Sequence, residues 1–349
     1  MNRYLSIYIC TLVSSTLLVG QHSLLNQTEG SIMTITGPIA ADSMGLALIH
    51  EHVFLDWSGA DKLDKGQWNN EDALRIILPY LQGMKENGVR TFLECTPAYL
   101  GRNPQLLLEI AKVTGLQILT NTGYYAARKY QHIPQSFYEQ TAEEIAEIWI
   151  NEFNVGIGGG QVRPGFIKIG LDARENLTSN DQKLVLAAAK THLATGLTIV
   201  SHTGTDQTAA LQISLLREHG VAPEAFVWTH AQRGTKEGHL NQAREGAWIS
   251  LDGLGWVHPT NGDSTKLYRY VDMISNLKEA GFLHRTLISH DAGWYTVGDK
   301  SQDKYQPYTP IFELLFPILV KRGFSETDIN QLLVKNPLEA YIIRVRNYP

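Results

Sequence analysis

The residues best suited to chemistry are histidines that directly follow short apolar runs of the chain. The first such run, Leu46–His50, continues into His50-Glu51-His52. Residues i and i+2 of a β-strand point to the same face, so both imidazoles are expected to project to one side of a sheet. Two adjacent imidazoles suit a borderline metal ion such as Zn²⁺, and their position at a strand end strengthens this moderate signal.

Further apolar runs also end in side chains that can bind a metal ion. They end in Ser201-His202, in Thr229-His230 and in Ser289-His290-Asp291. A single histidine at such a place is more often a hydrogen-bonded core residue, but ligand-capable side chains at the ends of four strands would crowd one spot. Crowded imidazoles and a carboxylate favour a bound cation. His290 allows two interpretations, because it either supports Asp291 from behind or simply points outward.

A lysine lies in the middle of another apolar run, Phe166–Ile169. Burying Lys168 is costly unless its charge is paired. Three interpretations are open: a salt-bridged core lysine, a lysine that forms a Schiff base, or a lysine carboxylated on its amine. The last would convert a cation into an anion that bridges two metal ions, and the metal-binding residues on both sides favour it.

The strands that position these side chains are expected from eight apolar runs. The runs are Leu46–His50, Thr91–Cys95, Gln117–Thr120, Phe166–Ile169, Leu197–Ser201, Phe226–Thr229, Trp248–Leu251 and Thr286–Ser289. Each is short and mostly apolar, which is typical of parallel strands buried on both faces. Amphipathic helical patterns separate them. This alternation predicts an α/β protein, a single-domain (β/α)8 TIM barrel over residues 31–349, with an open doubly wound sheet as the alternative.

The helical patterns are as clear as the strands. They cover Glu71–Lys85, Pro104–Val113, Ala142–Phe153, Asp181–Ala194, Gln207–Arg217, Lys236–Glu245 and Lys266–Ala280. Glycines that suit helix C-caps precede several strands, namely Gly88, Gly115, Gly196, Gly220, Gly246 and Gly281. The glycine-rich residues 156–160 are expected to form a loop, and residues 310–348 to form closing helices.

Composition excludes several classes of protein. The 349 residues carry a formal net charge of −5 and no basic run, so a nucleic-acid partner is not expected. Only two cysteines occur, Cys10 and Cys95, which excludes a disulfide framework and a cysteine-rich zinc site. The mix of 43% hydrophobic and 19% charged residues is that of an ordinary globular protein with a large core.

Residues 1–30 have the pattern of a secretory signal. Arg3 precedes an apolar stretch from Tyr4 to Gly20, after which the chain turns polar. This stretch is too short and too rich in Ser and Thr for a convincing membrane span. Export to the periplasm or the exterior is therefore expected, with no membrane contact of the mature form. A retained membrane anchor and a misassigned start codon are the alternatives.

Taken together, these motifs resemble the phosphotriesterase family of the amidohydrolase superfamily, which includes phosphotriesterase-like lactonases. The matching pieces are Gly45, His50-Glu51-His52, Phe166-Ile167-Lys168-Ile169, Ser201-His202-Thr203, Thr229-His230, Ser289-His290-Asp291, Thr122-Gly123-Tyr124-Tyr125 and Asn336-Pro337. Their order and spacing cover nearly the whole chain from about residue 34. Each piece alone is weak, but the set is highly specific.

The resemblance implies two divalent metal ions, normally zinc, with manganese, cobalt or iron also accepted. The residues implied as ligands are His50, His52 and Asp291 for the more buried ion, His202 and His230 for the more exposed one, and carboxylated Lys168 as a bridge. A hydroxide that bridges the metals would attack the substrate, and Asp291 would accept its proton. Tyr125 would either steer the leaving oxygen or only pack in its loop. The resemblance also implies a homodimer.

Departures from the family pattern bear on the substrate. After His230 the chain reads Ala231-Gln232-Arg233-Gly234, and Asp252 is not followed by the arginine of the lactonases. The leading hypothesis is hydrolysis of lactones or carboxylic esters with promiscuous phosphotriesterase activity, and a dedicated phosphotriester or phosphoester hydrolase is the alternative. A non-catalytic ligand-binding barrel is disfavoured because all six candidate ligands are present.

Overall fold

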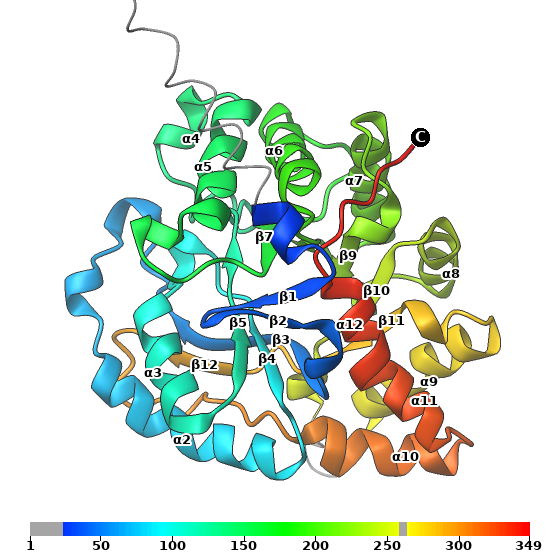
Figure 1. Cartoon of the computed structure of the whole chain (residues 1–349). Coiled ribbons are helices and arrows are strands. Elements are labelled where there is room, and N and C mark those ends of the chain that lie inside the picture. The colour runs from blue at the N-terminus through cyan, green and yellow to red at the C-terminus, as the bar shows by residue number, and fades with distance from the viewer. Residues whose placement is uncertain (1–23, 258–263) are drawn as a thin grey trace, which may run out of the picture.

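The computed structural model describes residues 24–257 and 264–349 (Figure 1). Most of the expected signal segment lies outside these residues. Residues 24–28 are helical, and the Thr28 side chain is only 1% exposed. The backbone N–H of Gly30 donates to the carbonyl oxygen of Ile343 at 2.9 Å. The chain therefore joins the folded domain before residue 31, the boundary expected from the sequence.

All eight predicted strands are present and pair in parallel. In chain order they are β3 (Ala47–Leu55), β4 (Thr91–Glu94), β5 (Gln117–Leu119) continued by β6 (Asn121–Thr122), β7 (Phe166–Gly170), β8 (Ile199–His202), β9 (Phe226–Thr229), β10 (Trp248–Leu251) and β11 (Thr286–Ile288). Each strand pairs with the one that precedes it. The predicted parallel α/β architecture is confirmed.

The first and last of these strands lie against each other and close the sheet. The backbone N–H of Asp291 donates to the carbonyl oxygen of His50 at 2.9 Å, and the N–H of His50 donates to Ser289 Oγ at 2.9 Å. The added strand β12 (Gly293–Thr296) also pairs with β3 in parallel. The closed barrel is therefore confirmed, and the open doubly wound alternative is wrong.

Helices surround the barrel (Figure 1). The seven predicted helices correspond to α2 (Asn70–Glu86), α3 (Pro104–Thr114), α5 (Ala142–Asn154), α6 (Ser179–Thr195), α7 (Asp206–Glu218), α8 (Lys236–Glu245) and α9 (Thr265–Glu279). All six predicted C-cap glycines have positive φ. A short α4 (Ser136–Glu139) precedes α5. Apolar side chains of the helices and strands form one continuous buried cluster between the two layers.

The C-terminal part of the chain only partly follows the prediction. It contains α10 (Phe316–Lys321), α11 (Glu326–Asn330) and α12 (Asn336–Tyr341), with π-helical turns at Ile311–Leu315 and Gln331–Lys335. Residues 342–349 are not helical, so the closing helices end earlier than predicted. Backbone hydrogen bonds instead join this segment to Gly30 and Ser31 and to residues that follow α6 and α7.

The sequence did not predict the hairpin of β1 (Ser31–Thr34) and β2 (Gly37–Ala40), which are antiparallel. Figure 1 shows this hairpin in front of the barrel strands, close to α12. Ile32 and Tyr341 join the apolar core that lies inside the barrel, beside Ile49 and Val227. The hairpin and α12 therefore cover one end of the barrel and leave the carboxyl ends of the strands for the site.

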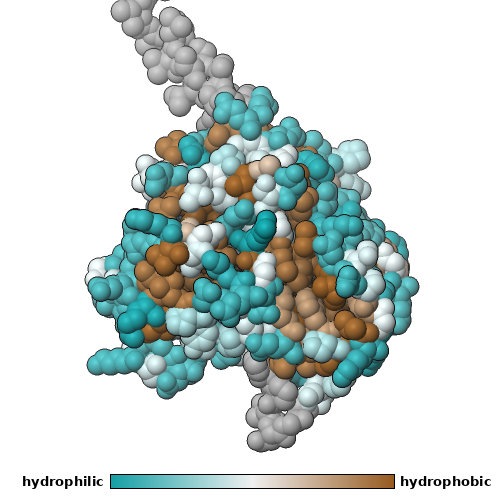
Figure 2. Space-filling view, turned by 60° about the horizontal axis from the view of Figure 1, so that its bottom comes forward, coloured by the Kyte–Doolittle hydropathy of each residue, from teal (hydrophilic) through white to brown (hydrophobic). Residues whose placement is uncertain are grey.

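Figure 2 shows a continuous hydrophobic area right of centre, with hydrophilic side chains around it. An apolar groove of about 510 Å³ lies between α10 and α11, lined by residues such as Phe312, Val320 and Leu333. Within residues 24–257 and 264–349, no helix is long and apolar enough to cross a membrane.

One glycine allows a close approach that the site depends on. Gly123 has φ +119°, and a Cβ there would lie 2.1 Å from the carbonyl oxygen of Lys168. Gly170, on the strand that carries Lys168, likewise leaves room for the ring of Tyr125. These two glycines let the loop after β6 press against β7 and bring Tyr125 to the strand ends.

We predict that Gly123→Ala lowers the free energy of unfolding by about 3 kcal/mol or more, because both its backbone conformation and its contact with Lys168 become unfavourable. Gly88→Ala is the matched control, since Gly88 has φ +85° but an open space around it. The control should cost only about 1–2 kcal/mol. Urea unfolding measures both, and equal losses would show that the contact with Lys168 is unimportant.

Candidate metal centre and active site

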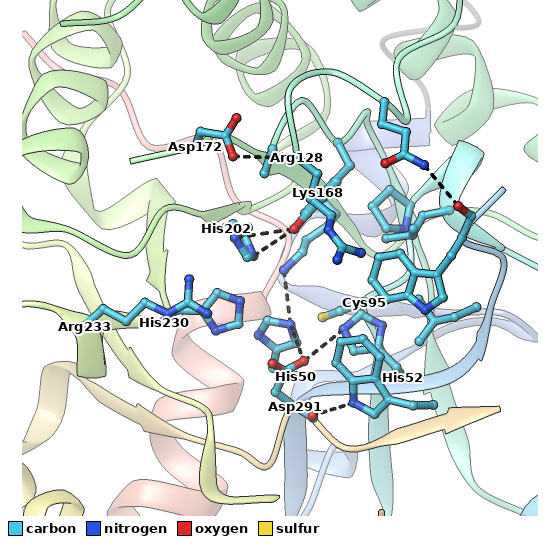
Figure 3. Close-up of a pocket in the computed structure, with 18 residues that line it drawn as sticks. His50, His52, Cys95, Arg128, Lys168, Asp172, His202, His230, Arg233 and Asp291 are labelled. Atoms are coloured by element: carbon cyan, nitrogen blue, oxygen red, sulfur yellow. Dashed lines mark hydrogen bonds and ion pairs between the residues drawn. The ribbon is translucent and has the colours of Figure 1, made fainter. Parts of the chain in front are cut away.

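The predicted site residues meet at the carboxyl ends of the barrel strands. A cavity of about 800 Å³ is lined by all six candidate ligands, His50, His52, Lys168, His202, His230 and Asp291, together with Tyr125. Figure 3 shows the six candidate ligands pointing toward one another from different strands and loops. Residues up to 241 positions apart in the chain, such as His50 and Asp291, thus come together.

The first group of possible ligands consists of His50, His52 and Asp291. Each offers one ligand atom, and these atoms all lie within 4.8 Å of one another. Asp291 Oδ1 lies 3.2 Å from His52 Nε2 and 3.8 Å from His50 Nε2. The two histidines come from β3 with the predicted spacing of two residues. A carboxylate and two imidazoles are a ligand set that divalent metals such as Zn²⁺ accept.

His202 and His230 form a second group on the other side of the cavity. Their ring centroids lie 4.4 Å apart, and the ring of His230 lies 5.1 Å from that of His50. His202 is the last residue of β8, whereas His230 follows β9 with φ 62°, in the left-handed region. No carboxylate of the described residues lies within 4.0 Å of His202. Apart from Asp252, which lies 2.8 Å from His230 Nδ1, no carboxylate of the described residues lies within 4.0 Å of this pair.

The buried imidazoles are neutral at ordinary pH. Burial lowers the pKa of His50 to about 4 and that of His52 to about 3, and the charge of Lys168 contributes in the same direction. Burial likewise holds the pKa of His202 well below its usual value. A neutral imidazole keeps a free lone pair on one nitrogen. These side chains are therefore in the protonation state that metal binding requires.

Asp252 orients one histidine of each group. Its carboxylate lies 3.0 Å from His50 Nδ1 and 2.8 Å from His230 Nδ1, and it is fully buried. Burial raises the pKa of Asp252, but His230 and His50 outweigh this and hold it well below the usual value. An ionised Asp252 accepts the Nδ1 proton of both rings, so their Nε2 atoms face the cavity. Sequence analysis gave Asp252 no role, although it directly follows β10.

His52 has a separate support. Its Nδ1 lies 2.8 Å from Thr96 Oγ1, and the Thr96 hydroxyl in turn donates to Glu94. Burial raises the pKa of Glu94 to about 8. Glu94 is the last residue of β4, and Thr96 comes two residues after it. The sequence predicted the end of this strand, but it gave no sign that these two side chains support the site. Each metal-facing ring on β3 therefore has its own hydrogen-bond partner behind it.

Lys168 lies between the two groups without an anionic partner. Its side chain is 2% exposed, and its Nζ lies 3.4 Å from His50 Nε2. Among the residues that the structure describes, no carboxylate lies within 4.0 Å of this amine. Within the described residues, the structure therefore gives no support to the interpretation of Lys168 as a salt-bridged core lysine. A buried free ammonium would be costly at this place. This cost favours the other two interpretations, a lysine that forms a Schiff base and a lysine carboxylated on its amine.

The turn that carries Asp291 is held by Glu51. The Glu51 carboxylate accepts hydrogen bonds from Ser289 Oγ at 2.7 Å and from the N–H of Ala292 at 3.0 Å. It also binds His290 Nδ1 at 2.8 Å, while His290 Nε2 accepts from the N–H of Ile311. His290 is fully buried and bound to Glu51 behind the turn of Asp291, which is compatible with the supporting interpretation and not with an outward-facing side chain. Glu51 keeps Asp291 in its left-handed conformation, with φ 52°.

Tyr125 lies at the edge of the second group. Its hydroxyl oxygen is 3.3 Å from His202 Nδ1 and 3.4 Å from His202 Nε2. Burial raises the pKa of Tyr125, so the hydroxyl stays protonated and can donate a hydrogen bond. The side chain also packs in the cavity wall, with 8% exposed. The position of Tyr125 is thus compatible with a role in steering the leaving oxygen and also with a role in packing alone.

A parallel barrel with imidazoles, a carboxylate and a buried lysine gathered at its carboxyl end is the arrangement of a metal-dependent barrel enzyme. The sequence profile described as the phosphotriesterase family matches residues 30–341. The chain belongs to this family, whose members are metal-dependent hydrolases with two metal ions. The prediction of a phosphotriesterase-family hydrolase is confirmed.

Individual relatives differ in the activity that their names state. Aryldialkylphosphatase of Saccharolobus solfataricus is 26% identical, over 86% of this chain and 95% of that protein. N-acetyltaurine hydrolase of Dictyostelium discoideum is also 26% identical, over 90% and 98%. The structure of an organophosphorus hydrolase from Deinococcus radiodurans superposes with a TM-score of 0.78 at 28% identity, covering 90% of this chain and 97% of the other.

We predict that Asp252→Asn weakens metal binding by roughly ten- to hundredfold, because the carboxylate no longer fixes the rings of His50 and His230. Asp272→Asn is the matched control, since Asp272 is 58% exposed and pairs only with Arg322 in the described structure. Titration of the metal-free protein with Zn²⁺ measures the change. Equal affinities of Asp252→Asn and the control would contradict this role of Asp252.

Proposed function

We propose that this protein is a hydrolase with two divalent metal ions that opens lactones or cleaves carboxylic esters, with promiscuous activity on phosphotriesters. The observation that carries the proposal is the convergence of four imidazoles and Asp291 around Lys168, which has no carboxylate partner among the described residues. Two metal ions are proposed because His50, His52 and Asp291 already form one group of possible ligands, and His202 and His230 add two more imidazoles beside it.

His50, His52 and Asp291 would hold one metal ion, and His202 and His230 the other. Lys168 would complete both sites as a carbamate, formed when its neutral amine adds to carbon dioxide and a proton leaves. This change would remove an unpaired buried cation and supply the anionic ligand that His202 and His230 lack. Zinc is the expected metal, and manganese, cobalt or iron also suit nitrogen and oxygen ligands. When bound, the metals supply Lewis-acid activation of water and of the substrate carbonyl.

The remaining steps depend on residues of the chain. Asp291 is placed to accept a proton from the attacking water, since its carboxylate is 16% exposed toward the cavity. Tyr125 can donate a hydrogen bond to the leaving oxygen from its position beside His202. Leu55, Leu100 and Trp294 line the cavity and would pack against the apolar part of the substrate.

The lactone or ester substrate is proposed over the phosphotriester because Tyr125 lies beside the candidate metal ligands. Solved relatives point in the same direction, since one is a variant of a phosphotriesterase-like lactonase and another was engineered from a weak promiscuous lactonase. A dedicated phosphotriesterase is the second candidate, favoured by the similarity to aryldialkylphosphatase. The similarity to N-acetyltaurine hydrolases adds an amide bond as a third type of scissile bond to be assayed.

We predict about two metal ions per wild-type chain and a clear loss of metal in Lys168→Ala, because the ligand shared by both sites is removed. Turnover of a lactone should fall with the metal. Lys190→Ala, a change of a partly exposed lysine on α6, is the control and should keep both. Elemental analysis and assays with a lactone, an aryl phosphotriester and an N-acyl amide measure the outcome.

Two results would contradict this proposal in different ways. Two metal ions without turnover of any lactone or ester would leave the metal site intact and overturn the substrate. No bound metal after reconstitution with Zn²⁺, Mn²⁺, Co²⁺ or Fe²⁺ would overturn the hydrolytic site itself and favour a ligand-binding barrel.

We predict that Tyr125→Phe lowers kcat for lactones by roughly tenfold or more, since a hydrogen bond to the leaving oxygen is lost. Metal content should not change. Tyr124→Phe is the matched control, because Tyr124 is the neighbouring buried tyrosine and packs on Trp149 away from His202. Steady-state kinetics measure the effect. Wild-type kcat in Tyr125→Phe would mean that this side chain only packs.

A further inference from the structure

Two arginines at the mouth of the cavity have no part in the proposed hydrolysis. Arg128 follows Tyr125 in the loop after β6, and Arg233 follows His230 in the turn after β9. Both residues are exposed, and both line the cavity that holds the candidate metal ligands. Figure 3 shows Arg128 and Arg233 approaching the histidines from two sides. Their charges therefore border the space that a substrate must enter.

Neither guanidinium is neutralised by a neighbouring acid. Six other arginines form ion pairs with Asp or Glu: Arg75, Arg102, Arg174, Arg217, Arg322 and Arg344. Within residues 24–257 and 264–349, no carboxylate lies within 4.0 Å of the guanidinium of Arg128 or Arg233. Two positive charges beside one cavity attract anions to it.

Arg128 is held in place before any ligand binds. The backbone N–H groups of Arg128 and Lys129 donate to the two carboxylate oxygens of Asp172, at 2.8 and 3.0 Å. The guanidinium carbon of Arg128 lies 4.3 Å from the ring centre of Trp57, a cation–π contact. Asp172, an acid at the cavity mouth, is thereby engaged by the backbone, and it also lies 3.8 Å from Arg174. It fixes the position of Arg128 rather than pairing with its side chain.

Arg233 is positioned by contacts with His230 and with Gly204, which lies two residues after His202. Its N–H donates to the carbonyl oxygen of His230 at 3.0 Å. Its stem crosses Gly204, where a Cβ would lie 3.3 Å from Arg233 Cδ. Burial raises the pKa of Tyr125, and the charges of both Arg128 and Arg233 oppose this effect. Arg128, Arg233 and Tyr125 line the same cavity.

We propose that Arg128 and Arg233 form an anion-binding subsite, and that the substrates of this enzyme carry a carboxylate or sulfonate group beyond the scissile bond. The planar guanidinium fork matches the oxygen atoms of such groups and forms paired, charge-assisted hydrogen bonds with them. The anion would lie at the mouth, while the scissile carbonyl reaches His202 and His230. This inference rests on the proposed hydrolytic function of the cavity and adds a substrate class to it.

The first test compares two γ-butyrolactones that differ only in a carboxyethyl or a carbamoylethyl side chain. The wild-type protein should prefer the anionic lactone, and Arg128→Gln/Arg233→Gln should lose roughly tenfold or more of kcat/KM on it while keeping its rate on the neutral lactone. Arg75→Gln/Arg244→Gln is the control with the same change of net charge, since neither residue lines the cavity. Added salt should weaken the preference of the wild type.

A binding measurement keeps the inference testable without turnover. Isothermal titration of the metal-loaded protein with pentanesulfonate, pentanoate and neutral pentanamide should show tighter binding of the two anions. The double variant of Arg128 and Arg233 should lose this difference while its metal content stays unchanged. Equal anion binding in the wild type and the double variant would mean that anions bind elsewhere, and it would overturn the inference.

The two proposals fail in distinguishable ways. Hydrolysis of both lactones at equal rates, with no effect of the double substitution, would overturn the anion subsite and leave the hydrolytic function standing. Hydrolysis of neither lactone, with anion binding that depends on Arg128 and Arg233, would support the subsite and overturn the lactone substrate.

Discussion

The rest of the site depends on one buried carboxylate that binds two imidazoles. Asp252 lies within 3.0 Å of His50 on β3 and within 2.8 Å of His230 beyond β9. A buried ionised carboxylate is stable only when its oxygen atoms are hydrogen-bonded, and these two rings provide that. In return, Asp252 fixes which nitrogen of each ring faces the cavity. The same interaction that orients these candidate ligands thus links β3 and the end of β9 to the residue after β10.

On the cavity side, several polar atoms have no partner among the described residues that would balance their charge or use their lone pairs. The Nε2 atoms of neutral histidines converge there, and the buried amine of Lys168 has no carboxylate partner among the described residues. Close packing of such groups is stable when cations and an added negative charge complete their coordination. The walls differ, since Trp57 and Leu100 are apolar while Arg128 and Arg233 are charged. In the proposed enzyme, the candidate metal ligands would determine the reaction, and the loops at the cavity would determine the substrate.

Local patterns were sufficient to predict the eight strands and all six residues that meet in the cavity, because strand ends of a barrel converge on one face. Asp252 and Glu51 were missed as supports because their partners are up to 239 positions away in the chain. The β1–β2 hairpin was missed because its two strands are short and only one is well buried. Tertiary contacts, rather than local periodicity, determine such elements.

We propose that two metal ions share Lys168 at the carboxyl end of the barrel. A crystal structure of the zinc-loaded protein, with anomalous diffraction measured at the zinc edge, tests it most directly. The account predicts two anomalous peaks, one beside His50, His52 and Asp291 and one beside His202 and His230, with density for a carboxylate added to the Lys168 amine. A single peak, or an unmodified Lys168 amine between two peaks, would contradict the claim.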